Sequence, residues 1–230
     1  MSIKQLSLTA TGAVVFAFSF AGAGYAGTVV GNNTDGNCYP FSCGPSDSVT
    51  IYQQVYNSTA FANPISISSI NFFKDSGGQM DSATYKVSLS TTLKSVLGLD
   101  NNYLNNIGVD NVEFGTFNIG GAMPDVLNLA GNSFNYNPTA GNLLMTVEVL
   151  NPTNILGGYN SFFQSDASGS ATSRLFTNLS GTTSNGTSAL VTEFNTTAIP
   201  TPALLPGLIG LGVAALRKRK AEAAEQANEV

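Results

Sequence analysis

Short runs in which apolar and polar residues alternate dominate the chain between residues 48 and 196. In one such run, Tyr85, Val87 and Leu89 alternate with Lys86 and two serines. Successive side chains of a strand point to opposite faces, so this pattern predicts a half-buried β-strand. Comparable runs predict about nine strands, at residues 49–56, 65–72, 85–90, 112–119, 126–129, 143–150, 159–163, 174–177 and 190–194.

Irregularities in this pattern predict where strands bend and where the chain turns. The apolar parity changes between Ile67 and Ile70, which predicts a β-bulge in that strand. Pairs rich in Gly and Asn, such as Gly120-Gly121 and Asn185-Gly186, are typical of turns.

One stretch, residues 92–106, has helical spacing, with Leu93, Val96 and Leu97 on a common face. We therefore expect an all-β fold: a single jelly-roll-like β-sandwich over residues 48–196, with this short helix at one end.

Composition excludes several classes of function. The chain has no His and no Trp, so a Ser-His-Asp triad, a Cys-His pair and His ligands for zinc are impossible. Residues 27–199 contain four basic and eleven acidic residues, a formal charge of -7, whereas the whole chain carries -5. An acidic domain lacks the basic surface that nucleic acid requires, so we expect no nucleic-acid partner.

The N-terminus has the pattern of a secretory signal peptide over residues 1–26. Lys4 supplies the positive charge, and an apolar run follows from Ala13 to Ala23. Small residues then precede a predicted cleavage site between Ala26 and Gly27. The apolar run is shorter than the ~20 residues of a membrane span, so cleavage is favoured over a retained anchor.

The C-terminal segment, residues 197–230, combines a short motif, an apolar stretch and a basic cluster. The motif is Pro200-Thr201-Pro202-Ala203, and an apolar helix is predicted from Pro206 to Leu216. Four cations follow, which the positive-inside rule would keep in the cytoplasm: Arg217, Lys218, Arg219 and Lys220. An amphipathic surface tail, or a helix docked on the domain, is the alternative interpretation.

This C-terminal arrangement resembles the PEP-CTERM class of bacterial sorting signals, in its PTPA variant. The resemblance covers about thirty residues, from the tetrapeptide to the basic cluster. It implies export across the inner membrane, transient anchoring there, and recognition by an exosortase-type protease. Delivery to the cell surface or to an extracellular polysaccharide matrix would follow.

Two cysteines lie in a segment, residues 27–47, that precedes the expected sandwich. Cys38 and Cys43 are on the exported side of the predicted cleavage site, where oxidation is expected. A disulfide that pins a local turn is therefore favoured. The spacing is not that of a Cys-x-x-Cys redox pair, and two cysteines without His do not make a zinc site.

No constellation in the sequence indicates catalysis, and we expect neither an enzyme nor a cofactor. Glycoside hydrolysis would need two acids flanking a bond, and the domain has only Glu113, Glu148 and Glu193 as glutamates. Glu113 and Glu148 have the spacing of outward-facing strand residues.

A calcium site is a weaker alternative, because oxygen-bearing residues cluster in two places. One cluster is Asn33, Asp35 and Asn37, and the other contains Asp100, Asn101, Asn102, Asp110 and Asn111. Turn formation and solvation by Asn and Asp also explain both clusters, and we favour this interpretation over calcium.

Three hypotheses for function follow. The first is a non-catalytic, exported component of the cell surface or extracellular matrix. The second is a lectin-like module that stacks sugars on exposed tyrosines, and the third is a glycan-active enzyme that uses carboxylates. The candidate stacking residues are Tyr52, Tyr56, Tyr103, Tyr136 and Tyr159.

Overall fold

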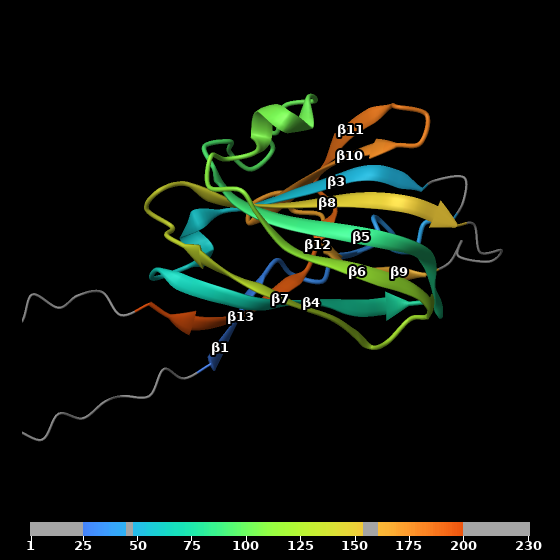
Figure 1. The fold of residues 1–230 in the computed structure, drawn as a ribbon, viewed down its shortest axis with the longest axis horizontal. Helices are drawn as coiled ribbons and strands as arrows, with labels where there is room; N and C mark the ends of the chain where they lie inside the picture. The colour runs from blue at the N-terminus through green and yellow to red at the C-terminus, as the bar shows by residue number, and fades with distance from the viewer. Residues whose placement is uncertain (1–24, 45–47, 154–160, 200–230) are drawn as a thin grey trace, which may run out of the picture.

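Strands form two antiparallel sheets that face each other across a shared core (Figure 1). The computed structural model describes residues 25–44, 48–153 and 161–199. Within these ranges the only helices are two short 3-10 turns, η1 at Ser58–Ala60 and η2 at Tyr103–Asn106. The predicted all-β sandwich is therefore confirmed.

The first sheet has seven strands, in the order β1-β13-β4-β9-β12, with β2 paired to β9 and β7 paired to β4. Its strands are β1 (Tyr25–Val30), β2 (Asp35–Asn37), β4 (Ile65–Ser76), β7 (Val126–Tyr136), β9 (Phe162–Asp166), β12 (Ala189–Leu190) and β13 (Thr192–Ala198).

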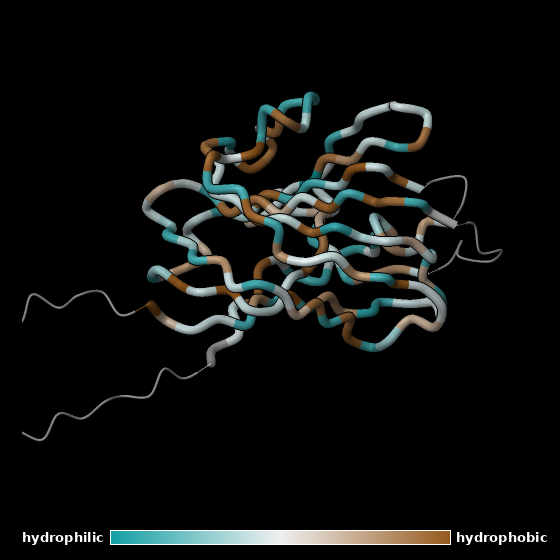
Figure 2. Tube along the Cα trace, in the orientation of Figure 1, coloured by the Kyte–Doolittle hydropathy of each residue, from teal (hydrophilic) through white to brown (hydrophobic). Residues whose placement is uncertain are grey.

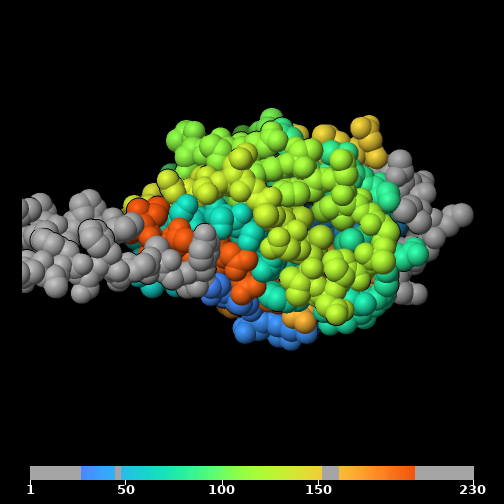
Figure 3. Space-filling model, turned by 60° about the horizontal axis from the view of Figure 1, so that its bottom comes forward, coloured from blue at the N-terminus to red at the C-terminus, as the bar shows by residue number. Residues whose placement is uncertain are grey.

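The second sheet has six strands, in the order β11-β10-β3-β8-β5-β6. Its strands are β3 (Val49–Tyr56), β5 (Gln79–Thr92), β6 (Val112–Ala122), β8 (Asn142–Thr153), β10 (Thr172–Asn178) and β11 (Thr183–Gly186). Figure 3 shows β6 and β7, in yellow-green, over much of one side of the molecule, where one edge of each sheet meets the other.

The predicted bulge in β4 is confirmed. The register of β4 against β7 shifts between Ile67 and Ser69, and β13 shifts against the same strand between Asn195 and Thr196. The extra residue restores the inward direction for Ile70, so Ile67 and Ile70 are both fully buried.

The helix predicted over residues 92–106 is wrong. Thr92 ends β5, and only Tyr103–Asn106 forms a 3-10 turn. Leu97 has a φ of 65°, which interrupts any right-handed helix. Leu93 and Leu97 are 92% and 60% exposed, so the apparent apolar face is not packed against the sandwich.

The segment that carries the cysteines is part of the sandwich and not a separate leader to it. β1 pairs with β13 from Tyr25 to Val30, and β2 pairs with β9. The predicted cleavage site between Ala26 and Gly27 therefore lies within β1, and a chain beginning at Gly27 would retain four residues of that strand.

Asn185-Gly186, predicted as a turn, belongs to β11.

Strand β3 is buried on both of its faces. Its even-numbered side chains, among them Tyr52 and Tyr56, point into the core between the sheets. On the other face, Gln53 and Val55 lie beneath the loop that follows β5, where Val55 packs with Leu99, Leu144 and Leu175. This loop is the green segment above β3 and β8 in Figure 1. Figure 2 shows apolar and polar residues alternating along the strands below it.

Hydrogen bonds between buried amides attach this loop to the sheet. Asn106 is 1% exposed, and its Nδ2 donates to Oε1 of the fully buried Gln53 at 2.8 Å. Asn106 Oδ1 accepts from the Asp100 N–H at 2.7 Å. Gln53 Nε2 in turn donates to the Tyr103 carbonyl at 3.0 Å.

We predict that Asn106→Ala lowers the free energy of unfolding by about 1–3 kcal/mol, because Gln53 Oε1 and the Asp100 N–H lose their partner while buried. The neighbouring Asn105→Ala, which removes one exposed hydrogen bond, should change it by less than about 0.5 kcal/mol. Urea denaturation measures both. Equal effects from the two substitutions would contradict the buried amide network.

Candidate functional site

The disulfide loop closes one end of the sandwich. Cys38 and Cys43 are bonded, as predicted, with an S–S distance of 1.98 Å and a Cα–Cα distance of 4.7 Å. The loop follows β2 and carries Phe41, which is completely buried. Its ring lies 5.4 Å from that of Phe72 and 5.0 Å from that of Tyr85, between centroids.

The aromatic anchor contributes more to this loop than the covalent bond does. Closing so short a loop lowers the entropy of the unfolded chain by an amount equivalent to about 2 kcal/mol. Truncating a buried Phe costs about 3–5 kcal/mol. The disulfide thus pins a local turn, as expected, and the turn places Phe41 in the core.

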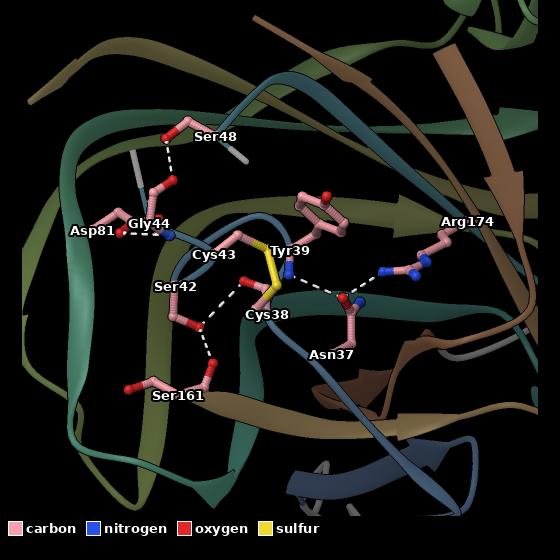
Figure 4. Close-up of a disulfide and its surroundings, with 10 residues drawn as sticks. All are labelled: Asn37, Cys38, Tyr39, Ser42, Cys43, Gly44, Ser48, Asp81, Ser161 and Arg174. Atoms are coloured by element: carbon pink, nitrogen blue, oxygen red, sulfur yellow. Dashed lines mark hydrogen bonds between the residues drawn. A yellow bond between two sulfur atoms is a disulfide. The ribbon is translucent and has the colours of Figure 1, made fainter. Parts of the chain in front are cut away.

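Hydrogen bonds frame the loop on both sides (Figure 4). Ser42 Oγ donates to the carbonyl of Ser161 at 2.8 Å, which ties the loop to the start of the β9 region. On the other side, the Gly44 N–H donates to both carboxylate oxygens of Asp81, at 3.1 and 3.0 Å. The loop is therefore held by β5 as well as by its neighbours.

The pKa values of two buried aspartates shift in opposite directions, because their hydrogen bonds offset burial to different extents. Burial raises the pKa of Asp81, and the hydrogen bonds from Gly44 and Cys43 only partly offset that effect. Burial also disfavours the charge of Asp166, but hydrogen bonds from Ser168 and Asn32 outweigh it and lower the pKa of that carboxyl.

A guanidinium lies between the sheets close to the disulfide loop. Arg174 of β10 sits 5.3 Å from the ring centroids of both Tyr39 and Phe176, whose rings stack at 4.2 Å. Its Nη1 donates to Oδ1 of Asn37, which also accepts the Tyr39 N–H at 2.9 Å (Figure 4). Arg174 could not be recognised from the sequence, because nothing in an isolated basic residue marks it as interior.

Each of the three glutamates of the domain has a polar partner. Glu148 forms an ion pair with Lys86 at 3.2 Å, and Glu113 accepts a hydrogen bond from Thr116. Glu193 lies in the other sheet, where it accepts from Asn71. Each carboxylate is thus engaged by a residue of its own sheet.

In the first oxygen cluster proposed for calcium, two of the three side chains accept hydrogen bonds from other parts of the protein. Asp35 accepts a hydrogen bond from Ser188, and Asn37 accepts from Arg174, so a protein cation already occupies this oxygen. Asn33 is exposed.

The second cluster forms turns. Asp100 accepts from the Asn102 N–H and from Asn105, and Lys94 lies 3.8 Å away. Asp110 accepts from the Thr91 N–H. In the part of the chain that the structure describes, no group of three or more Cys, Asp or Glu residues could hold a metal ion.

Most of the tyrosines proposed to stack on sugars are in the core, so that part of the prediction is wrong. Tyr52, Tyr56 and Tyr136 are completely buried. Their hydroxyl groups bond internally; that of Tyr136, for example, donates to the Gly141 carbonyl at 2.7 Å. Tyr103 packs against the cluster beneath the loop, and Tyr159 lies outside the described residues.

A hollow of about 600 Å³ lies where the loop after β5 meets the residues around Ala140. Leu93 and Val109, both almost fully exposed, lie on its rim. Its polar side chains already have partners within the loop, including Lys94 with Asp100 and Asp110 with the Thr91 N–H. The hollow therefore presents mainly carbon atoms to a ligand.

The sorting motif, the basic cluster and most of the predicted signal peptide lie outside the described residues. Within the described ranges, no helix is both long and apolar enough to cross a membrane. Comparisons with protein families, characterised proteins and solved structures find no match to this chain.

We predict that Phe41→Ala lowers the free energy of unfolding by about 3–5 kcal/mol, because it leaves a cavity among the rings of Phe72, Tyr85 and Phe163. Leu179→Ala, at a position that is 53% exposed, is the control and should have an effect below about 0.5 kcal/mol. Chemical denaturation of the oxidised proteins measures both. A loss for Phe41→Ala no larger than that of the control would contradict the assignment of Phe41 as an anchor.

We also predict opposite pH dependences for two aspartate variants. The pKa of Asp81 is above 3.8 in the folded protein, so ionisation destabilises the fold as the pH rises through that range. The stability of Asp81→Asn relative to the unsubstituted chain should therefore increase with pH above 3.8.

The pKa of Asp166 lies below 3.8, so its contribution is present above that pH and is lost as the pH falls. The deficit of Asp166→Asn should accordingly shrink in acid. Urea denaturation between about pH 3 and pH 7 separates the two cases. Parallel pH profiles for the two variants would contradict these assignments.

Proposed function

We propose that this chain is a non-catalytic, exported component of the cell surface or of an extracellular polysaccharide matrix. The observation that carries the proposal is the pair of terminal segments. A signal-peptide pattern precedes Gly27, and Pro200-Thr201-Pro202-Ala203 precedes an apolar stretch and four cations. A C-terminal tail of this kind resembles a sorting signal that an exosortase-type protease in the inner membrane processes.

The disulfide supports export, because such bonds persist mainly in oxidising compartments. Cys38 and Cys43 account for both cysteines of the chain, and they are bonded to each other. Neither is available as a thiol nucleophile or a metal ligand. The bond therefore has the character of a structural link in an exported domain.

The arrangement of the carboxylates supports a non-catalytic role over the glycan-active enzyme. Glu113, Glu148 and Glu193 each have a partner within their own sheet. Glycoside hydrolysis instead needs two acids that flank a substrate bond.

The lectin-like alternative has lost part of its basis. Three of the five tyrosines that would stack on sugar rings are completely buried. A binding mode that uses aromatic stacking on those three side chains is therefore ruled out. Contact with a polysaccharide through charge or hydrogen bonding does not depend on those three side chains.

We predict that the full chain, expressed in a bacterium that has an exosortase-type protease, reaches the surface or extracellular fraction in a shortened form. The double variant Pro200→Ala/Pro202→Ala should lose its signal peptide but keep its C-terminal tail, because the motif before the apolar stretch is lost. It should therefore accumulate in the inner membrane. Pro138→Ala, in the turn before β8, is the matched control and should be processed normally. Cell fractionation and mass spectrometry of the C-terminus measure both.

Two results would count against the proposal. Recovery of the unsubstituted chain mainly from the cytoplasm would reject export. Unchanged processing of the double variant would reject the role of the tetrapeptide in sorting.

A further inference from the structure

We propose that Arg174 and Asn37 form a binding site for a carboxylate anion between β10 and β2. The first observation is a charge without a counter-charge. In the described residues, Lys86 and Lys94 pair with Glu148 and Asp100, whereas Arg174 has no acidic group within 4.0 Å. A partly buried cation without an anion is unfavourable, and a bound anion would relieve that cost.

The hydrogen bonds of the guanidinium leave one edge unused. Nη1 donates to Asn37 Oδ1, while Nε is buried and has no partner. Among the residues that the structure describes, Nη1 is the guanidinium nitrogen that donates a hydrogen bond. Nε and Nη2 form the side-on edge of the guanidinium, whose two parallel N–H groups match the two oxygens of a carboxylate.

Two further buried atoms of the described residues have no hydrogen-bond partner. Asn37 is 3% exposed, and its Nδ2 makes no hydrogen bond although its Oδ1 accepts two. Ser165 is completely buried on the paired strand β9, and its Oγ is also without a partner. Orphaned polar atoms in an interior are uncommon, so their presence on both members of the hydrogen-bonded pair Arg174 and Asn37 supports a missing ligand.

Gly186 leaves space beside the unused edge. It pairs with Arg174 across β10 and β11, and a Cβ placed on it would lie 3.5 Å from Nε, with no other neighbour within 4 Å. Any larger side chain there would extend into the space that a ligand of Nε needs. A substitution at Gly186 can therefore block the site without altering the guanidinium.

The charge balance favours a carboxylate over a phosphate or sulfate. A single guanidinium can neutralise one negative charge, and the surrounding residues 27–199 carry a formal charge of -7. A dianion would meet both an uncompensated second charge and this negative background. A carboxylate could come from a uronic acid unit of a polysaccharide or from a small organic acid, and the experiment distinguishes these sources.

The test measures binding to the full chain by isothermal titration calorimetry at constant ionic strength. Sodium acetate and sodium glucuronate are the carboxylate probes, glucose is the neutral probe, and sodium sulfate is the dianion. We expect saturable binding of acetate, glucuronate or both, with no binding of glucose and weaker binding of sulfate. Binding of acetate alone would identify small organic acids as the source, and tighter binding of glucuronate would identify uronic acids.

Two variants test the site itself. Arg174→Lys keeps the charge but loses the side-on edge, and Gly186→Val fills the space next to Nε. Each should weaken carboxylate binding at least about tenfold, the value of one hydrogen bond to a charged group. The matched control is Lys74→Met, which removes a cation that also lacks an ion pair, and it should change the affinity less than about twofold.

Circular dichroism and thermal unfolding without ligand check that each variant is folded. If Arg174→Lys does not fold, Gly186→Val still decides the question, because valine suits a strand. Three results would overturn the proposal: no saturable carboxylate binding, binding that survives Gly186→Val, or an equal loss in Lys74→Met. Sulfate binding tighter than that of both carboxylates would overturn it as well.

Discussion

The burial of β3 on both faces is the constraint on which the rest of the structure depends. A sheet with one face in water could be stabilised by a single core, but β3 needs two covers. The opposite sheet covers Tyr52, Gln54 and Tyr56, and the loop after β5 covers Gln53 and Val55. The loop can satisfy this requirement with a few anchored positions, so it needs no regular helix and leaves Leu93 in solvent.

Polar side chains inside the sandwich fix how the two sheets meet. Gln54 is completely buried, and its amide donates to the Leu190 carbonyl at 2.7 Å while accepting the Leu190 N–H at 2.9 Å. The hydroxyl of Tyr56 lies 3.0 Å from that of Thr192 in the same opposing sheet. Apolar contacts alone would permit the sheets to slide, whereas these directional bonds are satisfied in one alignment.

The sequence was sufficient for features that depend on neighbours along the chain. Alternation located Tyr85, Val87 and Leu89 correctly, and a change of parity located the bulge after Ile67. The sequence could not predict the burial of side chains that are covered by segments from elsewhere in the chain. Alternation within 49–56 says nothing of the loop that covers the outer face, and an interior tyrosine with a bonded hydroxyl looks like an exposed one. The helix predicted over residues 92–106 is wrong for a related reason. Leu97 adopts a left-handed backbone conformation that helical spacing in the sequence does not reveal.

The short cysteine loop carries two aromatic rings that pack in different parts of the interior. Cys38 and Cys43 enclose both Tyr39, which stacks on Phe176 beside Arg174, and Phe41, which anchors the loop among Phe72, Tyr85 and Phe163. The covalent bond restricts the backbone between these two rings, so it limits how far Tyr39 can move while Phe41 remains buried. Asn37 precedes the loop directly and holds the Tyr39 N–H and Arg174 Nη1 on one oxygen. The disulfide therefore restrains the backbone of the loop whose Tyr39 ring lies beside the Arg174 guanidinium.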